Sequence, residues 1–278
     1  MVLAVMVIIL AIGQALNRDS NLAQMNYRPG NSAVVKLNHN RSTLNPHSWR
    51  ADHVRYAQLD RFQRNHDGNG ADLDNRNVAH DTLRQRQFIY PSGWHQKMID
   101  HQLIVNRGHL IAYSLSKGIA RNGNYRPDQL SGDQNNPDNL FTQTAFSNQK
   151  LQTIYESKVR QALYQHKRVI FKAQPIFRGH ELMARGVHLQ AVSTDRALNF
   201  NVYLFNVQPG VKFDYMTGEA AADPAMRIPV PRAAPRFHDQ HSAGRSLTAR
   251  QGNDWQKRDY RYRPARRGRL MEKRVVVN

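Results

Sequence analysis

The chain has 278 residues, with 40 Lys and Arg against 21 Asp and Glu, a formal net charge of +19, and no cysteine. This length can bury a sizeable core and predicts one main domain with tails. The basic charge favours an anionic partner, most often nucleic acid but also a membrane or wall surface, over a plain solvated surface. The lack of cysteine excludes a disulfide framework and a cysteine-based zinc site.

The first 16 residues are almost entirely apolar. The run is short for a membrane span of roughly 20 residues, and it resembles the hydrophobic region of a secretion signal or a short signal anchor. A buried core helix is the alternative, but polar sequence follows at once and no amphipathic period is visible. We therefore expect a signal peptide or signal anchor over residues 1–16, with membrane attachment if it is uncleaved, and a polar linker over residues 17–32.

Residues 60–87 predict a long exposed loop, because they are dense in Arg, Asp, Asn and His. Within them, Asp67-Gly68-Asn69-Gly70 resembles a calcium loop, which needs oxygen ligands at its first, third and fifth positions and glycine at the sixth. Ala71 and Asp72 break that spacing, so we prefer the loop interpretation.

The strand-like segments are apolar runs before and after this loop. Ala33–Leu37 is typical of a first strand, and three further runs are Arg168–Phe177, Val187–Ser193 and Leu198–Val207. With the helix described below, their order predicts an α+β domain with a central antiparallel sheet.

The composition changes from about Glu219. Residues 227–278 hold 14 Lys and Arg but only 4 acidic residues, with few apolar ones. Such a segment cannot offset its own ordering entropy, so residues 219–278 predict a basic, disordered tail. The tail could hold DNA through its phosphates, or it could be a solvated or wall-tethering extension.

The chain is organised around Val105–Ile111, where Arg107 and His109 flank Gly108. Arginine carries a fixed planar charge that matches a phosphate, and histidine can take a proton near neutral pH. The glycine removes a side chain, so that a bulky anion can approach the backbone closely. The pattern indicates a site for an anionic substrate.

A second stretch predicts a helix from Thr144 onward, because its apolar residues recur close to a 3.6-residue period. Asn148, Glu156 and Arg160 are spaced by eight and four residues, which at about 100° per residue places them on one side. An amide oxygen, a carboxylate and a guanidinium on one helix face suit a hydrated metal and a phosphate.

Together the two stretches resemble the DNA/RNA non-specific endonucleases of the ββα-metal (His-Me finger) fold. The most similar subgroup is the secreted or membrane-anchored DNA-entry nucleases of Gram-positive bacteria. Members carry Asp-Arg-Gly-His, or Asn-Arg-x-His in this subgroup, on a strand, followed by an Asn-rich segment and a helix with the metal ligand. The resemblance implies a nuclease domain over residues 33–218. It also includes Val34–Asn38, Tyr56–Asp60, Pro91–Trp94 and Asn206–Gly210.

The resemblance implies catalytic roles for four residues. His109 would be the general base that takes a proton from water. Asn148 would be the direct ligand of Mg²⁺, with Mn²⁺ as a substitute, since this ion keeps most of its waters. Glu156 would bind the metal's waters, with an exposed helical carboxylate as the alternative. Asn139 would position the base or a metal water, unless it is a plain turn residue after Pro137.

The resemblance also implies contacts to the substrate. Arg107 and Arg160 would grip the phosphate and favour the charge of the transition state, and Arg64 aligns with an arginine of the subgroup. Asn106 replaces the aspartate of the wider family. Its amide still accepts a hydrogen bond but adds no negative charge, so we expect lower metal affinity and not loss of activity.

The leading interpretation is a secreted or surface-anchored, Mg²⁺-dependent, sequence-nonspecific endonuclease that acts on DNA, with RNA open as a second substrate. The sequence shows no base-reading module, which favours contacts to backbone phosphates. A non-catalytic DNA-binding surface protein that assists DNA uptake is the alternative, but it would tolerate loss of His109, Asn148 and Glu156. A basic structural protein of the cell wall would explain the charge and none of the motifs.

Overall fold

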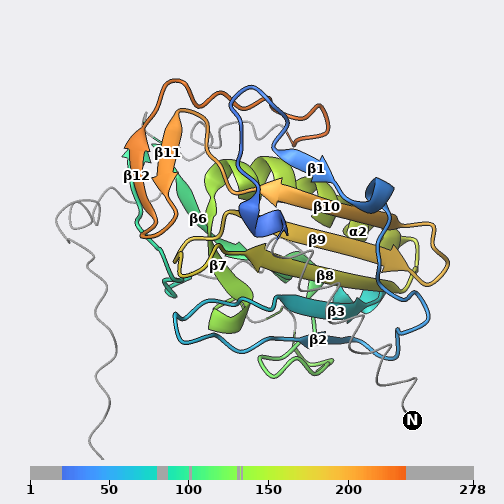
Figure 1. The fold of residues 1–278 in the computed structure, drawn as a ribbon. Coiled ribbons are helices and arrows are strands. Elements are labelled where there is room, and N and C mark those ends of the chain that lie inside the picture. Colours follow the sequence, from blue (N-terminus) through green and yellow to red (C-terminus); the bar gives the residue numbers. More distant parts are fainter. Residues whose placement is uncertain (1–20, 80–86, 100–101, 130–131, 133, 236–278) are drawn as a thin grey trace, which may run out of the picture. The chain divides into compact units, whose positions relative to one another are not determined.

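The computed structural model describes residues 21–79, 87–99, 102–129, 132 and 134–235 (Figure 1). The predicted signal or anchor over residues 1–16 lies outside the described residues, as do residues 236–278 of the predicted tail. Among the described residues, every helix is too short or too polar to span a lipid bilayer.

The main element is a six-stranded sheet in the order β1-β10-β9-β8-β3-β2, with every neighbouring pair antiparallel (Figure 1). Its longest strands are the three apolar runs predicted after the helix, and β1 lies within the predicted Ala33–Leu37. The central antiparallel sheet is therefore confirmed. The strands span Val34–Lys36 (β1), His53–Arg55 (β2), Asn69–Leu73 (β3), Val169–Ile176 (β8), Gly186–Ser193 (β9) and Asn199–Phe205 (β10).

The smaller elements surround this sheet in three two-stranded pairs and several helical turns. The pairs are Met98–Ile99 (β4) with Gln102–Leu103 (β5), Val105–His109 (β6) with Leu140–Thr144 (β7), and Val211–Asp214 (β11) with Glu219–Ala222 (β12). Short 3-10 turns span Asn38–Asn40, Asn75–Asn77, Tyr113–Leu115 and Pro137–Asn139.

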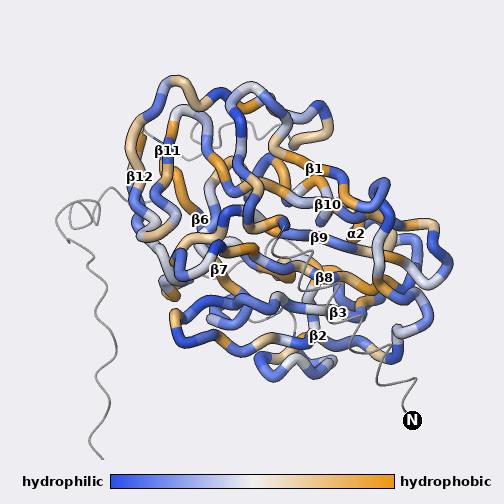
Figure 2. The backbone as a smooth tube through the Cα atoms, in the orientation of Figure 1, coloured by the Kyte–Doolittle hydropathy of each residue, from blue (hydrophilic) through white to orange (hydrophobic). Residues whose placement is uncertain are grey.

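One face of the sheet is covered by a helical segment that consists of a π-helical part, Ser147–Gln152 (η6), and an α-helix, Thr153–Tyr164 (α2). Figure 1 shows α2 passing behind β9 and β10. The ring of Tyr155 lies 5.0 Å from that of Phe200 on β10, between centroids. In Figure 2 the hydrophobic residues are concentrated along the main strands, whereas the connecting loops are largely hydrophilic.

The helix begins later than predicted. Thr144 is the last residue of β7, and its Oγ1 accepts a 3.0 Å hydrogen bond from the amide of Ser147. A threonine hydroxyl in this position caps the start of a helix. The periodicity of the apolar residues predicted the helix but not its first residue, because it does not show where the strand that carries the buried Thr144 ends.

The predicted exposed loop over residues 60–87 is wrong in its centre. β3 pairs with β8 there, and Leu73 is fully buried. Two of its polar side chains have partners elsewhere in the chain: Asn69 Nδ2 donates to Asn139 Oδ1, and Asp72 forms ion pairs at 3.7 Å with His53 and Arg55. Asn and Asp are depleted in strands, and this tertiary pairing overrides that tendency.

The predicted domain boundaries are too narrow. Residues 21–32, predicted as linker, pack on the core, since Leu22 is buried and Arg178 Nε donates to the carbonyl of Ala23 at 2.8 Å. At the other end, the boundary at Gly218 cuts the β11–β12 hairpin. Gly218 has a φ of +89°, which suits the hairpin turn, and the fold continues to Pro235, so residues 219–235 are not a disordered tail.

Candidate active site

The two motifs found in the sequence meet in one ββα unit, formed by β6, β7 and the η6–α2 helix (Figure 1). β6 and β7 are antiparallel, with Val105 opposite Thr144 and His109 opposite Leu140. His109 therefore stands at the end of β6, and Asn148 lies in the first turns of the helix that follows β7.

The imidazole of His109 is half-buried and oriented by the backbone. Its Nε2 lies 3.2 Å from the carbonyl oxygen of Gln134. A carbonyl only accepts hydrogen bonds, so we assign the proton of the neutral ring to Nε2 and the lone pair to Nδ1. Gln87 Nε2 donates to the same oxygen at 3.3 Å and lies 3.2 Å from His109 Nε2, as expected for two donors that share one acceptor.

Asn139 is buried, with 1% of its surface exposed. Its Oδ1 accepts from the amide of Ile111 at 2.9 Å and from Asn69 Nδ2 at 3.0 Å, and its Nδ2 donates to the carbonyl of Ile111 at 2.9 Å. Both lone pairs of its oxygen are thus used. Of the roles considered for Asn139, this geometry fits the positioning of His109, two residues before Ile111, and does not fit a contact to a metal water.

Asn148 and Glu156 lie on the helical segment that follows β7, Asn148 in η6 and Glu156 in α2. The side-chain amide of Asn148 makes no hydrogen bond to any described residue, so its oxygen can accept a ligand. Glu156 is half-buried, and its Oε1 accepts from Gln152 Nε2 at 2.8 Å. Burial raises the pKa of the Glu156 carboxyl, while the Gln152 hydrogen bond and the charge of Arg160 oppose that shift.

Gln152 joins the helix to the strand that carries the histidine. Its Nε2 also donates to the backbone carbonyl of His109 at 2.7 Å, and its Oε1 accepts from Gln143 Nε2 at 3.0 Å. The only signal of Gln152 in the sequence is its spacing of four residues before Glu156. The π-helical part Ser147–Gln152 shifts the phase of Asn148 relative to α2, which a constant turn of 100° per residue did not anticipate.

The arginines differ in their surroundings. Arg160 is half-buried and donates to Ser114 Oγ at 2.6 Å, just beyond β6. The guanidinium carbon of Arg107 lies 4.7 Å from the ring centroid of Tyr90 and 4.6 Å from that of Trp94, and its Nε donates to the carbonyl of Ile89. Burial lowers the pKa of Arg107 from its ordinary value, and Tyr90 opposes this shift.

Arg64 is held by contacts within the protein. It is buried and forms two hydrogen bonds with Asp60, at 2.9 and 2.7 Å, and others with the carbonyls of Gly179 and Glu181. These contacts do not fit the role in substrate binding predicted for Arg64, because its guanidinium is used within the protein.

The structure gives Gly108 a different role from the one expected from the sequence. A Cβ on this residue would lie 2.3 Å from Gln143 Oε1 and 2.7 Å from Gln143 Cβ. The glycine makes room for the Gln143 side chain, which reaches Gln152 beneath the strand, and not for a bulky anion as the sequence suggested.

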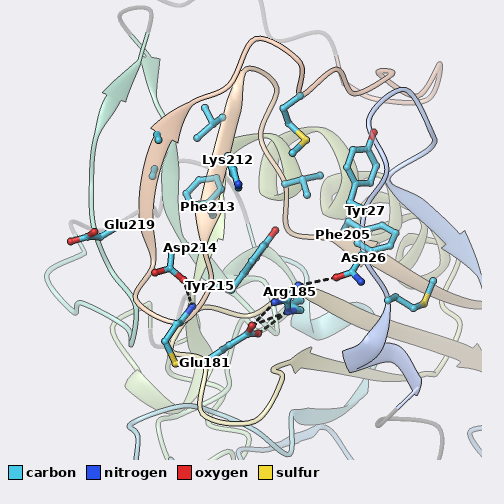
Figure 3. Close-up of a pocket in the computed structure, with 17 residues that line it drawn as sticks. Asn26, Tyr27, Glu181, Arg185, Phe205, Lys212, Phe213, Asp214, Tyr215 and Glu219 are labelled. Atoms are coloured by element: carbon cyan, nitrogen blue, oxygen red, sulfur yellow. Dashed lines mark hydrogen bonds and ion pairs between the residues drawn. The ribbon is translucent and has the colours of Figure 1, made fainter.

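A separate cavity of about 740 Å³ lies beside the β11–β12 hairpin and is lined by none of the predicted site residues. Figure 3 shows the Glu181–Arg185 ion pair and the ring of Tyr215 at this cavity, with Asn26 and Tyr27 beside them. It contains no histidine, and its Arg185 is held by Glu181 at 2.8 and 3.0 Å. We do not regard it as the catalytic centre.

The sequence profile of the DNA/RNA non-specific endonuclease family matches residues 15–233. The chain belongs to this family. It is therefore a nuclease, an enzyme that hydrolyses nucleic acid.

Solved structures of nucleases share its fold. A crystal structure of NucA from Streptococcus agalactiae with magnesium bound is 31% identical in sequence, with a TM-score of 0.60 over 76% of this chain and 98% of NucA. NucA from Streptococcus agalactiae without metal gives 33% identity and a TM-score of 0.59 over 76% and 97% of the two chains. The Sda1 nuclease with bound zinc, at 18% identity, a TM-score of 0.52 and coverage of 71% and 100%, shows likeness of fold alone.

Proposed function

We propose that this nuclease is a sequence-nonspecific endonuclease that hydrolyses the phosphodiester backbone of DNA and RNA, with Mg²⁺ as its metal. His109 is the general base, and Asn148 is the direct metal ligand. The observation that carries the proposal is the 3.2 Å contact of His109 Nε2 with the Gln134 carbonyl, on the same ββα unit as Asn148 and Glu156.

In this mechanism His109 Nδ1 takes a proton from a water molecule, and the resulting hydroxide attacks the phosphorus. The P–O3′ bond breaks, and the 3′ oxygen leaves with the electron pair and takes a proton from a second water molecule. The Gln134 carbonyl accepts from Nε2–H throughout and stabilises the imidazolium that forms. Asn139 and Gln152 hold the backbone on either side of the ring, at Ile111 and at the His109 carbonyl. The ring therefore needs little reorganisation during the reaction.

The donor set supports Mg²⁺. Among the described residues, no group of three or more His, Asp or Glu side chains gathers as a metal site. Asn148 offers one neutral oxygen, and Glu156 can orient waters, which suits an ion that keeps several waters and takes one or two protein ligands. When bound, the metal supplies positive charge to the phosphate and to the leaving 3′ oxygen. NucA from Streptococcus agalactiae binds magnesium, which favours the same ion, with Mn²⁺ as a substitute.

We assign Arg160 and Arg107 to the phosphate. Arg160 stands one helical turn after Glu156 and is tied to Ser114 near the end of β6. Arg107 precedes His109 by two residues on the same strand, so both side chains project from one face of β6.

We also place the enzyme outside the cell or at its surface. The support is the apolar segment Met1–Leu16, which suits export, and retention of that segment would tether the enzyme to the membrane. An exported nuclease would be kept apart from the nucleic acid of its own cell.

Digestion of closed circular plasmid tests the proposal, because a circle without ends can be cut only by an endonuclease. We expect nicking and linearisation with Mg²⁺, none with EDTA, and recovery when Mg²⁺ or Mn²⁺ is restored. His109→Ala should lower the rate by about 10²–10⁴-fold, whereas His47→Ala, an exposed histidine in the loop before β2, should not. Cleavage by His109→Ala within tenfold of the wild type would reject the assignment of the base.

A further inference from the structure

Gln87–Trp94 lies alongside β6 and across the candidate active site. Gln87 contacts His109, the carbonyl of Ile89 accepts from Arg107, and the ring of Trp94 also lies against Arg107. A nucleic acid strand bound at His109 must therefore pass this segment.

The segment presents aromatic rings to solvent. Among the described residues, seven large hydrophobic side chains stand out as exposed, and four of them lie between residues 88 and 103: Phe88, Tyr90, Met98 and Leu103. Phe88 is 65% exposed and Tyr90 is 51% exposed. A group of large apolar side chains at the surface is a sign of an interaction site, whereas single exposed apolar residues are normal.

The two rings share one side of the segment. Gln87 and Ile89 are partly buried against the site, whereas Phe88 and Tyr90 are exposed, as in an extended chain whose alternate side chains point to opposite sides. The main chain is fixed on both sides of Phe88. Its amide donates to Asn135 Oδ1 at 3.0 Å, and Gln87 Nε2 donates to the Gln134 carbonyl at 3.3 Å.

A cation completes this surface. The Arg107 guanidinium lies over the rings of Tyr90 and Trp94, whose centroids are 6.0 Å apart. Aromatic rings combined with arginine are how proteins hold single-stranded nucleic acid, since bases stack on the rings and the cation attracts the phosphate.

We propose that Phe88 and Tyr90 form a stacking subsite for an unpaired nucleobase of the substrate, next to the phosphate that is cleaved. The proposal rests on the proposed function, with His109 as the catalytic centre. Because Phe88 and Tyr90 lie next to that centre, the ligand that reaches them is the nucleic acid substrate. An unpaired base offers a free face to the rings, whereas a base inside a duplex is already stacked on its neighbours. The subsite therefore favours single-stranded or locally opened nucleic acid over regular duplex.

The test measures binding in EDTA, where gel analysis confirms that the probe stays intact. The probes are a single-stranded DNA oligonucleotide with 2-aminopurine, whose fluorescence falls on stacking, and the same sequence as a duplex. Four variants are compared with the wild type: Phe88→Ala, Phe88→Leu, Phe88→Trp and Tyr164→Ala. Tyr164 is the matched control, because it is 63% exposed at the end of α2.

We expect Phe88→Ala and Phe88→Leu to weaken single-strand binding about tenfold, with less quenching and a smaller effect on the duplex. Phe88→Trp should retain binding, and Tyr164→Ala should match the wild type. The proposal is overturned if Phe88→Leu binds like the wild type, if both probes lose affinity equally, or if size-exclusion shows that Phe88 instead mediates self-association. The binding test involves no cleavage, so its result is independent of the plasmid assay with His109→Ala. Failure of the stacking subsite can therefore be distinguished from failure of the proposed function.

Discussion

The side-chain amide of Gln152 donates a 2.7 Å hydrogen bond to the backbone carbonyl oxygen of His109. The same nitrogen donates to Glu156 Oε1 at 2.8 Å. One buried glutamine thus fixes the distance between the strand that carries the proposed base and the carboxylate proposed to orient the metal's waters. Residues that hydrogen-bond to metal ligands usually affect metal affinity and activity strongly when they are replaced.

Replacement of Gln152 by leucine should therefore impair catalysis without emptying the space that the side chain fills. We expect kcat to fall about 10–100-fold and the Mg²⁺ midpoint to rise, as when outer partners of metal sites are removed. The variant also removes the hydrogen bonds that Gln152 makes with the His109 carbonyl and with Gln143 Nε2, which should lower stability by about 1–3 kcal/mol. Plasmid cleavage against Mg²⁺ concentration, well below the melting temperature, separates the two effects.

Gln149→Ala provides the control for this experiment, since Gln149 lies in the same π-helical segment but is exposed. It should keep the wild-type midpoint and rate. An unchanged Mg²⁺ midpoint in Gln152→Leu would show that Gln152 serves only the packing of the helix.

Asn148→Ala should abolish Mg²⁺-dependent cleavage, and high metal concentration should restore it poorly. Asn148 is the one amide on the helix that we assign as a direct ligand, and its side chain has no hydrogen bond to any described residue to lose. Its replacement should therefore affect metal binding much more than stability. Isothermal titration with Mg²⁺ and thermal unfolding check both expectations, and an unchanged titration midpoint would remove Asn148 from the metal site.

A residue of the site could be predicted from the sequence where its side chain has the proposed role, but not where its backbone has that role. The roles that we propose for His109, Asn148 and Glu156 depend on their side chains, so residue types and spacing could single them out as candidates. Gln134 acts through its backbone carbonyl, which every residue has, so no sequence pattern could identify it. Arg64 was selected by alignment with a charged residue, but its burial against Asp60 depends on tertiary contacts.

The same distinction explains the fold. β8 and β10 are long apolar runs whose burial is evident from composition. β3 contains Asn69 and Asp72, whose partners Asn139 and Arg55 are remote or on another strand, so the segment looked like a solvated loop. Polar residues that are paired in the core are hard to distinguish from polar residues in water when only the chain is known.

Asp52 predicts a pH dependence of stability that is unrelated to catalysis. Burial, and then the nearby charge of Asp74, raise the pKa of its carboxyl to about 6, although Arg76 opposes the shift. The folded state therefore holds a proton that the unfolded chain releases near its ordinary pKa of about 4. Stability should fall as the pH rises from about 4 to about 6 and should then level off.

Asp52→Asn removes this titration, so the variant should gain stability relative to the wild type across that pH range. Melting temperatures measured between pH 4 and 8 test the sign. Asp195→Asn is the opposite control, because hydrogen bonds from Lys167 and Ser193 lower the pKa of Asp195, and its stabilisation is lost as the pH falls. Parallel curves for Asp52→Asn and the wild type would contradict the expectation.

Removal of residues 236–278 should leave an active nuclease that binds DNA more weakly and with less dependence on salt. The cut follows Pro235, where the compact unit ends and where Lys150 Nζ still donates to the Pro235 carbonyl at 3.0 Å. The segment carries 12 basic and 4 acidic residues. For each phosphate that the truncated enzyme no longer neutralises, the slope of log K against log salt should flatten by about 0.9 on duplex DNA or about 0.7 on single strands.

Arg107 and Arg160 remain in the truncated enzyme, so cleavage at low salt should persist. Binding is compared in a His109→Ala background with and without the segment, from low to moderate salt, and equal slopes would indicate that residues 236–278 do not bind DNA.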